Sequence, residues 1–325
     1  MASSATPQRA PVETRRHEKY DGLLAAAKAL PRLKVAVAHP CDTTSLGATL
    51  EAASLGIIDP ILVGPQGKIA ATANSLKADL SELRIVDAPH SHAAAEKAVA
   101  LVKAGEAEAL MKGSLHTDEL MAAVVRRDGG LRTARRVSHC FVMDVPSYES
   151  ALIVTDAAIN IAPTLEDKVD IVQNAIDLAH ALRIETVRVA ILSAMETVNP
   201  KVPSTIEAAA LCKMADRGQI TGGILDGPLA LDNAIDLGAA KIKNIRSPVA
   251  GQANVLVVPD LEAGNMLAKS LTFLADADAA GIVLGARVPI ILTSRADSQI
   301  TRLASCAVAS LVAEAQRAKL ALPEV

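Results

Sequence analysis

Short apolar runs alternate with stretches of helical spacing along the first third of the chain. The apolar runs that predict strands are residues 34–38, 60–64, 84–86 and 107–112. The stretches that predict helices are residues 44–55, 91–104 and 118–125. Strands that alternate with helices form a parallel sheet with helices on both faces, so this part of the chain predicts an α/β fold.

The middle of the chain repeats the pattern and adds a change of direction. Residues 139–145 and 151–155 predict neighbouring strands in antiparallel order, and residues 165–182 predict a long helix. Further strands are predicted at 187–192, 224–226, 255–258 and near residue 290. The last of these, with the helix that follows it, can return to the first domain.

The length of 325 residues fits two domains of roughly 150 residues each. Residues 1–18 are polar and predict a flexible N-terminal arm. We expect the first α/β domain to comprise residues 19–148 plus 290–325, and the second to comprise residues 149–289.

Composition narrows the classes of function. The chain has two Phe, two Tyr and no Trp, so stacking on nucleic-acid bases is excluded as its main activity. A net charge of −3 also argues against a nucleic-acid partner. Charged residues interrupt the apolar runs and no signal-peptide core is present, so we expect a cytoplasmic protein without a membrane partner. The four cysteines are scattered, which indicates neither a metal site nor a disulfide framework.

The segment after the last predicted strand carries the sharpest chemical signal. Thr293, Ser294 and Arg295 stand where that strand ends, and helical spacing begins near Asp297. Ligands of open α/β sheets bind at such strand ends. A guanidinium placed there can hold an anion or stabilise developing negative charge, so Arg295 is the first candidate for chemistry.

A second polar turn follows the strand at 107–112. Lys112 and Gly113 precede Ser114, His116 and Thr117 at the start of a predicted helix. Glycine permits a tight turn, and backbone N–H groups at a helix start favour an anion. The alternative is an ordinary helix cap formed by the residue at 117 or 118.

Weaker signals come from acids and arginines elsewhere. Asp226 follows a strand and can bind a ligand or a metal, although Asp-Gly and Gly-Pro favour a turn. Asp260 reads as a helix cap, which makes Asn265 the better ligand candidate there. Arg132 lies near the strand at His139 and can meet a phosphorylated ligand. A catalytic pair of this histidine with the next residue, a cysteine, is not expected, because neighbours on a strand point to opposite faces.

These stretches in this order resemble the phosphate acetyl/butyryltransferase family, most closely its butyryl branch, from about residue 34 to the C-terminal helix. The matching segments are residues 111–113 with 117, 130–133, 137–139, 155–163, 198–201, 226–234, 257–265 and 293–298. The resemblance implies reversible transfer of a short acyl group between coenzyme A and inorganic phosphate. It also implies two three-layer α/β/α domains with a cleft between them, as in isocitrate and isopropylmalate dehydrogenases, and a homodimer.

The resemblance also assigns roles to residues, with acyl-CoA and phosphate as substrates and no cofactor. Arg295, Ser294 and Asp297 are expected to be catalytic. The residues expected to bind phosphate or acyl phosphate are Lys112, Gly113, Ser114, His116, Thr117 and Arg132. The residues expected to bind coenzyme A are Asp226, Asp260, Gly264, Asn265 and Thr293. No metal ligands are expected. Direct attack of the coenzyme A thiolate in a ternary complex fits this set better than an acyl-cysteine intermediate.

Two departures from the family pattern concern the general base and the acyl chain. An arginine of the acetyl branch is missing from residues 120–123, and Thr301 stands where an acidic residue is usual. The small Ala122 and Ala123 suggest room for an acyl chain longer than acetyl. Two rival functions remain at this point, a non-catalytic acyl-CoA-binding relative and a dehydrogenase of related fold.

Overall fold

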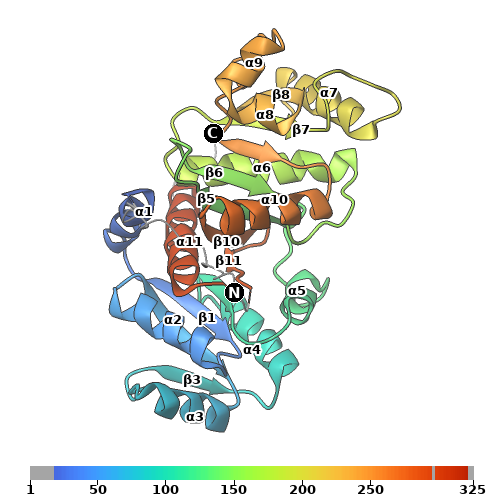
Figure 1. Cartoon of the computed structure of the whole chain (residues 1–325). Helices are drawn as coiled ribbons and strands as arrows, with labels where there is room; N and C mark the ends of the chain where they lie inside the picture. Colours follow the sequence, from blue (N-terminus) through green and yellow to red (C-terminus); the bar gives the residue numbers. More distant parts are fainter. Residues whose placement is uncertain (1–17, 295–296, 321–325) are drawn as a thin grey trace, which may run out of the picture.

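The computed structural model describes residues 18–294 and 297–320 and shows an α/β molecule (Figure 1). The strands are β1 Leu33–Ala38, β2 Ile58–Gly64, β3 Arg84–Asp87, β4 Ala109–Lys112, β5 Ser138–Asp144, β6 Leu152–Thr155, β7 Arg188–Leu192, β8 Ile224–Leu229, β9 Val255–Val257, β10 Asp278–Leu284 and β11 Ile290–Ile291. The helices are α1 Glu18–Lys28, α2 Thr43–Ser54, α3 Gln66–Leu76, α4 Ser91–Lys103, α5 Thr117–Val125, α6 Leu165–Ala181, α7 Pro203–Asp216, α8 Leu231–Ile235, α9 Leu237–Ile242, α10 Leu261–Leu274 and α11 Gln299–Leu320.

Within the described residues, all strands join one eleven-stranded sheet in the order β3-β2-β1-β4-β11-β10-β5-β6-β9-β7-β8. The strands on each side of the centre run parallel, whereas β10 is antiparallel to both β11 and β5, and β5 is antiparallel to β6. The predicted antiparallel pair is therefore confirmed. The strand near residue 290 does return to the first half, because Ile290 of β11 pairs with Leu110 of β4. The division into domains remains a prediction.

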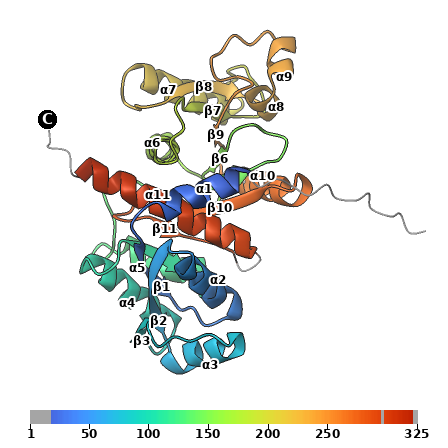
Figure 2. The ribbon, with the colours of Figure 1, turned by 90° about the vertical axis from the view of Figure 1, so that its left-hand side faces the viewer.

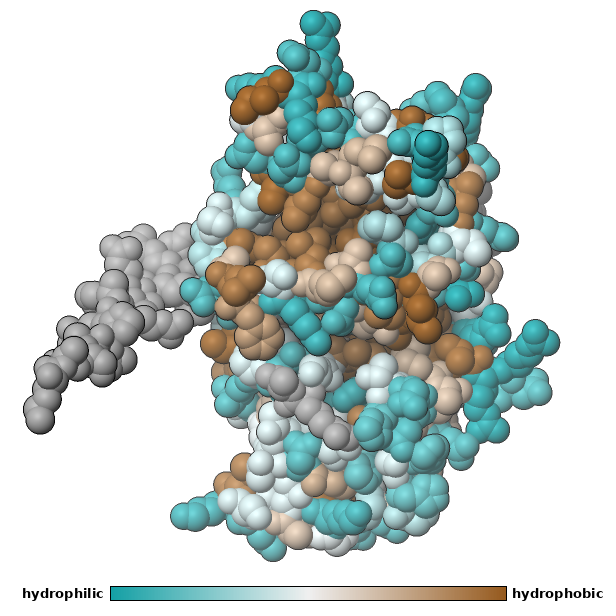
Figure 3. All heavy atoms as spheres, turned by 45° about the vertical axis from the view of Figure 1, so that its right-hand side comes forward, coloured by the Kyte–Doolittle hydropathy of each residue, from teal (hydrophilic) through white to brown (hydrophobic). Residues whose placement is uncertain are grey.

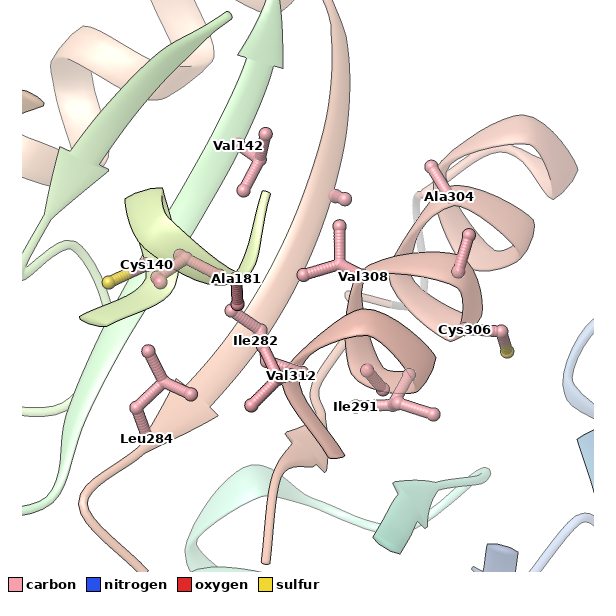
Figure 4. Packing of buried hydrophobic residues seen from close by; sticks show 14 of the residues in the cluster. Cys140, Val142, Ala181, Ile282, Leu284, Ile291, Ala304, Cys306, Val308 and Val312 are labelled. Atoms are coloured by element: carbon pink, nitrogen blue, oxygen red, sulfur yellow. The ribbon is translucent and has the colours of Figure 1, made fainter. Parts of the chain in front are cut away.

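One face of the sheet carries a single continuous core. Side chains alternate along each strand, so Val35 and Val37 of β1 face this core and Ala36 of the same strand faces the other side. Helices α1, α2, α3, α6, α7 and α11 pack on this face. Figures 2 and 4 show α11 lying along the central strands, with Val308 and Val312 against Ile282.

The opposite face carries two separate cores instead of one. Helices α4 and α5 cover the first half of the sheet, and α8, α9 and α10 cover the second half. Between them, β10 contributes Val283 to one core and Ala279 to the other, and Gly281 stands between these two residues without a side chain. This break between the two cores leaves the central strands open on one face.

Two local expectations differ from the structure. Strand β10 was not predicted, because the Ala- and Gly-rich residues 279–281 shorten its apolar run to residues 282–284. The segment Asp226-Gly227-Pro228 was expected to form a turn, but it continues β8, and the pairing register with β7 shifts there. No helix in the described part of the chain combines the length and hydropathy that a membrane crossing requires.

Candidate active site

A cleft of about 790 Å³ opens over the central strands, between α5 on one side and α10 on the other. Its floor comes from β5, β10 and the segment after β11, including His139, Phe141 and Leu292. Figure 3 shows apolar side chains gathered in the middle of this side of the molecule, between polar ends. The lining also includes Leu115 and Leu292 of one core and Ala277 and Ala279 of the other, so the cleft lies where the two cores separate.

The turn between β11 and α11 brings two of the three expected catalytic residues, Ser294 and Asp297, to the cleft. Thr293 is buried, Ser294 is exposed, and both line the cleft together with Asp297. The backbone N–H of Ser294 donates to the carboxylate of Asp297, and the N–H of Asp297 faces the Ser294 carbonyl at 3.3 Å. Arg295 lies outside the described residues, so its catalytic role remains a prediction.

Opposing effects act on the pKa of the Asp297 carboxyl. Its partial burial raises the pKa of the carboxyl above the usual value. The Ser294 N–H and the charges of Arg302, Lys112 and Lys269 act in the opposite direction. The two lysines line the cleft from β4 and α10, so the carboxylate faces cations from two sides.

The turn after β4 contributes only part of the expected anion site. Lys112, His116 and Thr117 line the cleft. Gly113 is required by close packing, because a Cβ there would lie 2.4 Å from the backbone oxygen of Ala38.

Ser114 faces the loop after β1. Its Oγ lies 3.0 Å from Nδ1 of His39 and donates to the carbonyl of that histidine at 2.8 Å. The helix cap that the sequence offered as the alternative is present, but one residue earlier than expected, at His116, whose backbone N–H donates to Glu119.

His139 is fully buried beneath the cleft. Neither of its ring nitrogens makes a well-formed hydrogen bond within the described residues, although the Leu292 carbonyl is near enough to raise its pKa. Burial is the largest effect and lowers the pKa to about 4 against the negative charge of Asp156, which raises it, so the imidazole is neutral near pH 7. The ring packs edge-on against Phe141 at 4.4 Å between centroids. Cys140, on the opposite face of β5, belongs to the continuous core, as the sequence predicted.

Helix α10 forms the opposite wall. Asp260 caps it by accepting from the N–H of Ala263, and a Cβ on Gly264 would lie 2.6 Å from the Asp156 carbonyl. Of the residues expected to bind coenzyme A here, Asn265 lines the cleft. Its side chain donates to the carbonyl of Ala157 at 3.3 Å.

Two predicted binding residues lie elsewhere. Neither Arg132 nor Asp226 is among the described residues that line the cleft. Arg132 is exposed, and its backbone forms an isolated antiparallel β-bridge with Ala286. Asp226 lies on the edge strand β8, five strands from β10, which corresponds to roughly 24 Å at normal strand spacing. A ligand that contacts both Asp226 and the cleft would have to be long.

Sequence reasoning missed several cleft residues. Lys269, Phe141 and Phe273 belong to no motif that the sequence analysis singled out, yet all three line the cleft. The chain contains only two phenylalanines, and both are in this set. The rarity of phenylalanine in this chain could have marked these two residues as candidates. The position of Lys269 on a predicted helix does not distinguish it from a solvent-exposed lysine.

Comparisons with known proteins show the family to which the chain belongs. A family model described as "Phosphate acetyl/butaryl transferase" matches residues 90–310, which includes the walls of the cleft and the turn at Ser294. The chain belongs to this family.

Curated members of the family match most of the chain. A phosphate acetyltransferase of Rhizobium meliloti is 67% identical over 92% of this chain and 95% of its own length. A phosphate butyryltransferase of Clostridium acetobutylicum is 42% identical over 91% of this chain and 98% of its own length. The resemblance recognised in the sequence is therefore confirmed for the family.

Solved structures show the same fold. A branched-chain phosphotransacylase from Enterococcus faecalis aligns with a TM-score of 0.76 at 30% identity, covering 86% of this chain and 99% of that one. A 4-hydroxythreonine-4-phosphate dehydrogenase from Klebsiella pneumoniae aligns with a TM-score of 0.54 at 13% identity, over 87% of this chain and 99% of that one. The second match concerns the fold alone and agrees with the dehydrogenase-like α/β fold expected from the sequence.

Proposed function

We propose that this phosphate acetyl/butyryltransferase family member transfers a short acyl group reversibly between coenzyme A and inorganic phosphate. The observation that carries the proposal is the cleft itself, where Ser294 and Asp297 line the same cavity as Lys112 and Lys269. Cations on two sides of one pocket suit a substrate that carries phosphate. The apolar floor at Phe141 and Leu292 suits an acyl chain or a thioester.

In the direction that forms acyl-CoA, the coenzyme A thiolate attacks the carbonyl carbon of the acyl phosphate. A tetrahedral intermediate forms, the bond from that carbon to the bridging phosphate oxygen breaks, and inorganic phosphate leaves with the electron pair. A guanidinium at Arg295 would lower the pKa of the thiol and offset charge on the intermediate. In this transfer one carbon–sulfur bond forms and one carbon–oxygen bond breaks without a change of oxidation state, so the step itself requires neither a metal ion nor a redox cofactor.

Direct transfer is favoured over an acyl-cysteine intermediate by the state of the chain's own thiols. Burial raises the pKa of Cys140, Cys212 and Cys306 to about 12 and that of Cys41 to about 11. Thiols with such pKa values are almost entirely protonated near pH 7 and are poor nucleophiles. We therefore propose a ternary complex in which coenzyme A attacks the acyl phosphate directly.

The proposal is tested by thiol release from acetyl-CoA with and without inorganic phosphate. Release that depends on phosphate supports acyl transfer. Tight binding of acetyl-CoA without release indicates a non-catalytic acyl-CoA-binding protein, and reduction of NAD by a hydroxy acid indicates a dehydrogenase.

The homodimer and the cytoplasmic location that the family resemblance and composition implied remain proposals. Light scattering of the purified protein tests the first, and cell fractionation tests the second.

A further inference from the structure

Arg302 is a buried cation directly beneath the turn that carries Ser294. It lies in the first turn of α11, and only 3% of the residue is exposed. Its Nη1 donates to Oγ1 of Thr293 at 2.9 Å, and its Nη2 donates to the carbonyl of Ser294 at 2.7 Å. One guanidinium thus spans two consecutive residues of the turn.

The backbone N–H of Ser294 is held as well as its carbonyl. Its N–H donates to the carboxylate of Asp297, and the charge of Arg302 acts on that same carboxylate. The carbonyl of Ser294 is therefore fixed by Arg302 and its N–H by Asp297. The N–H and the carbonyl of Ser294 are both fixed, which limits where its hydroxyl can point.

Burying an arginine at this position costs free energy that an apolar side chain would not. Arginine is almost never buried unless its charge is paired, and the buried Nε of Arg302 has no hydrogen-bond partner among the described residues. Buried charges often contribute no more to stability than an apolar side chain of similar volume. The two hydrogen bonds from this costly cation to the turn beside the cleft point to a role in placing that turn.

We propose that Arg302 is a positioning residue of the acyl transfer, which holds the Thr293–Ser294 turn in its reactive geometry. The inference rests on the proposed function, because the turn matters only if the reaction takes place at it. Arg302 contacts no substrate in this account, and it acts through Ser294 and Asp297.

The proposal predicts a change in pH dependence as well as in rate. The groups that face Asp297 and lower its pKa are Arg302 on α11, Lys112 on β4, Lys269 on α10 and the N–H of Ser294. Removing the charge of Arg302 removes one of these effects, so the pKa of Asp297 rises further. The acid limb of the activity profile then moves to higher pH.

The test compares Arg302→Met and Arg302→Lys with a control on the same helix. Arg317→Met removes an arginine of α11 that donates hydrogen bonds to Glu108 and Glu314. Neither of these glutamates is among the described residues that line the cleft. We expect Arg302→Met to keep its Tm and its KM values but to lose about 10- to 100-fold in kcat, as for a displaced reacting group. The acid limb of the pH–activity profile of Arg302→Met moves to higher pH, and hydrogen exchange at residues 293–298 becomes faster than in the wild type.

Arg302→Lys keeps the charge and one hydrogen bond but not the fork, so it should recover part of kcat and keep the acid limb in place. Wild-type kcat and pH profile in a folded Arg302→Met would overturn the proposal. If Arg302→Met does not fold, Arg302→Lys decides: reduced kcat at unchanged KM supports positioning, and wild-type kcat means a structural role. A wild-type protein without phosphate-dependent thiol release overturns the proposed function instead, whereas exchange at 293–298 still tests the hold of Arg302 on the turn.

Discussion

At the scale of single residues, the candidate chemistry depends on charges placed around one short turn. Ser294 and Asp297 close that turn through a backbone N–H and a carboxylate. Lys112 and Lys269 face the same carboxylate from other elements. A cluster of this kind suits a reaction in which negative charge moves between a phosphate and a carbonyl oxygen.

The first prediction concerns Arg295. Arg295→Ala should lose about 100-fold or more in kcat while the fold is kept, because a donor to the tetrahedral intermediate is worth roughly 3 to 4 kcal/mol. Arg295→Lys should recover only part, since a point charge replaces a planar fork. Circular dichroism serves as the folding control, and near wild-type turnover of a folded Arg295→Ala would rule out the electrostatic role.

The second prediction concerns His139 and the stability of the protein in acid. Burial lowers the pKa of His139 from 6.5 in the unfolded chain to about 4 in the folded protein. The unfolded state therefore binds the proton first as pH falls through this window. Stability is lost between pH 6.5 and 4, by on the order of 1 kcal/mol per pH unit.

Urea unfolding of the wild type and of His139→Phe, measured across this window, isolates the effect. The variant places a ring of similar size that does not titrate at the same site. The free energy of unfolding should fall more steeply for the wild type than for the variant. Parallel pH dependence of the two proteins would mean that His139 is already protonated or not buried in solution.

At the scale of elements, the loops after β1 and β4 are tied together at Gly113. Its N–H donates to the carbonyl of Ala38, and the N–H of Ser114 donates to the carbonyl of His39. This pairing fixes the path of the chain from Lys112 into α5, and so sets one wall of the cleft.

The third prediction follows from that contact. Gly113→Ala should destabilise the protein by about 1 to 3 kcal/mol, because its Cβ would lie 2.4 Å from two backbone oxygens. The matched control is Gly67→Ala in α3, where a Cβ meets nothing within 4 Å. That control should be neutral or stabilise by up to about 1 kcal/mol. Equal unfolding midpoints for the two variants would show that the loops separate at little cost.

Most elements could be predicted from the sequence because their apolar periodicity was clear, as in 34–38 and 165–182. Strand β10 was missed because residues 278–281 give no strand signal and leave an apolar run of only three residues, 282–284, and its place was set by pairing with β5 and β11. Lys112 and Ser294 were found because polar residues after strands mark sites. Lys269 and Arg302 were not, because nothing local distinguishes them from other charges on helices.

At the scale of the whole molecule, the cleft follows from how the helices are distributed. One continuous core on one face keeps the two halves together, and two separate cores on the other leave the middle of the sheet open.

The residues expected to select the acyl chain do not line this cleft. Ala122 is exposed, and Ala123 packs in the core beneath α4 and α5, so the argument from these alanines for a longer acyl chain is wrong.

The fourth prediction is therefore that acetyl-CoA is used at least as well as butyryl-CoA. An extra methylene contributes about 0.8 kcal/mol only if an apolar pocket receives it, and the two alanines that were expected to make room for it are not among the described residues that line the cleft. The measurement is kcat/KM for acetyl-, propionyl- and butyryl-CoA in the wild type and in Ala122→Leu. A strong preference for butyryl-CoA, or a preference that changes in Ala122→Leu, would contradict this assignment.

The most direct test of the account is the stoichiometry of the reaction in the purified protein. Thiol released from acetyl-CoA is measured together with acetyl phosphate, which is trapped with hydroxylamine, in the presence of inorganic phosphate. We predict one acetyl phosphate for each thiol, no release without phosphate, and loss of both products together in Arg295→Ala. Thiol release that continues without phosphate and yields free acetate would contradict transfer to phosphate and indicate a hydrolase.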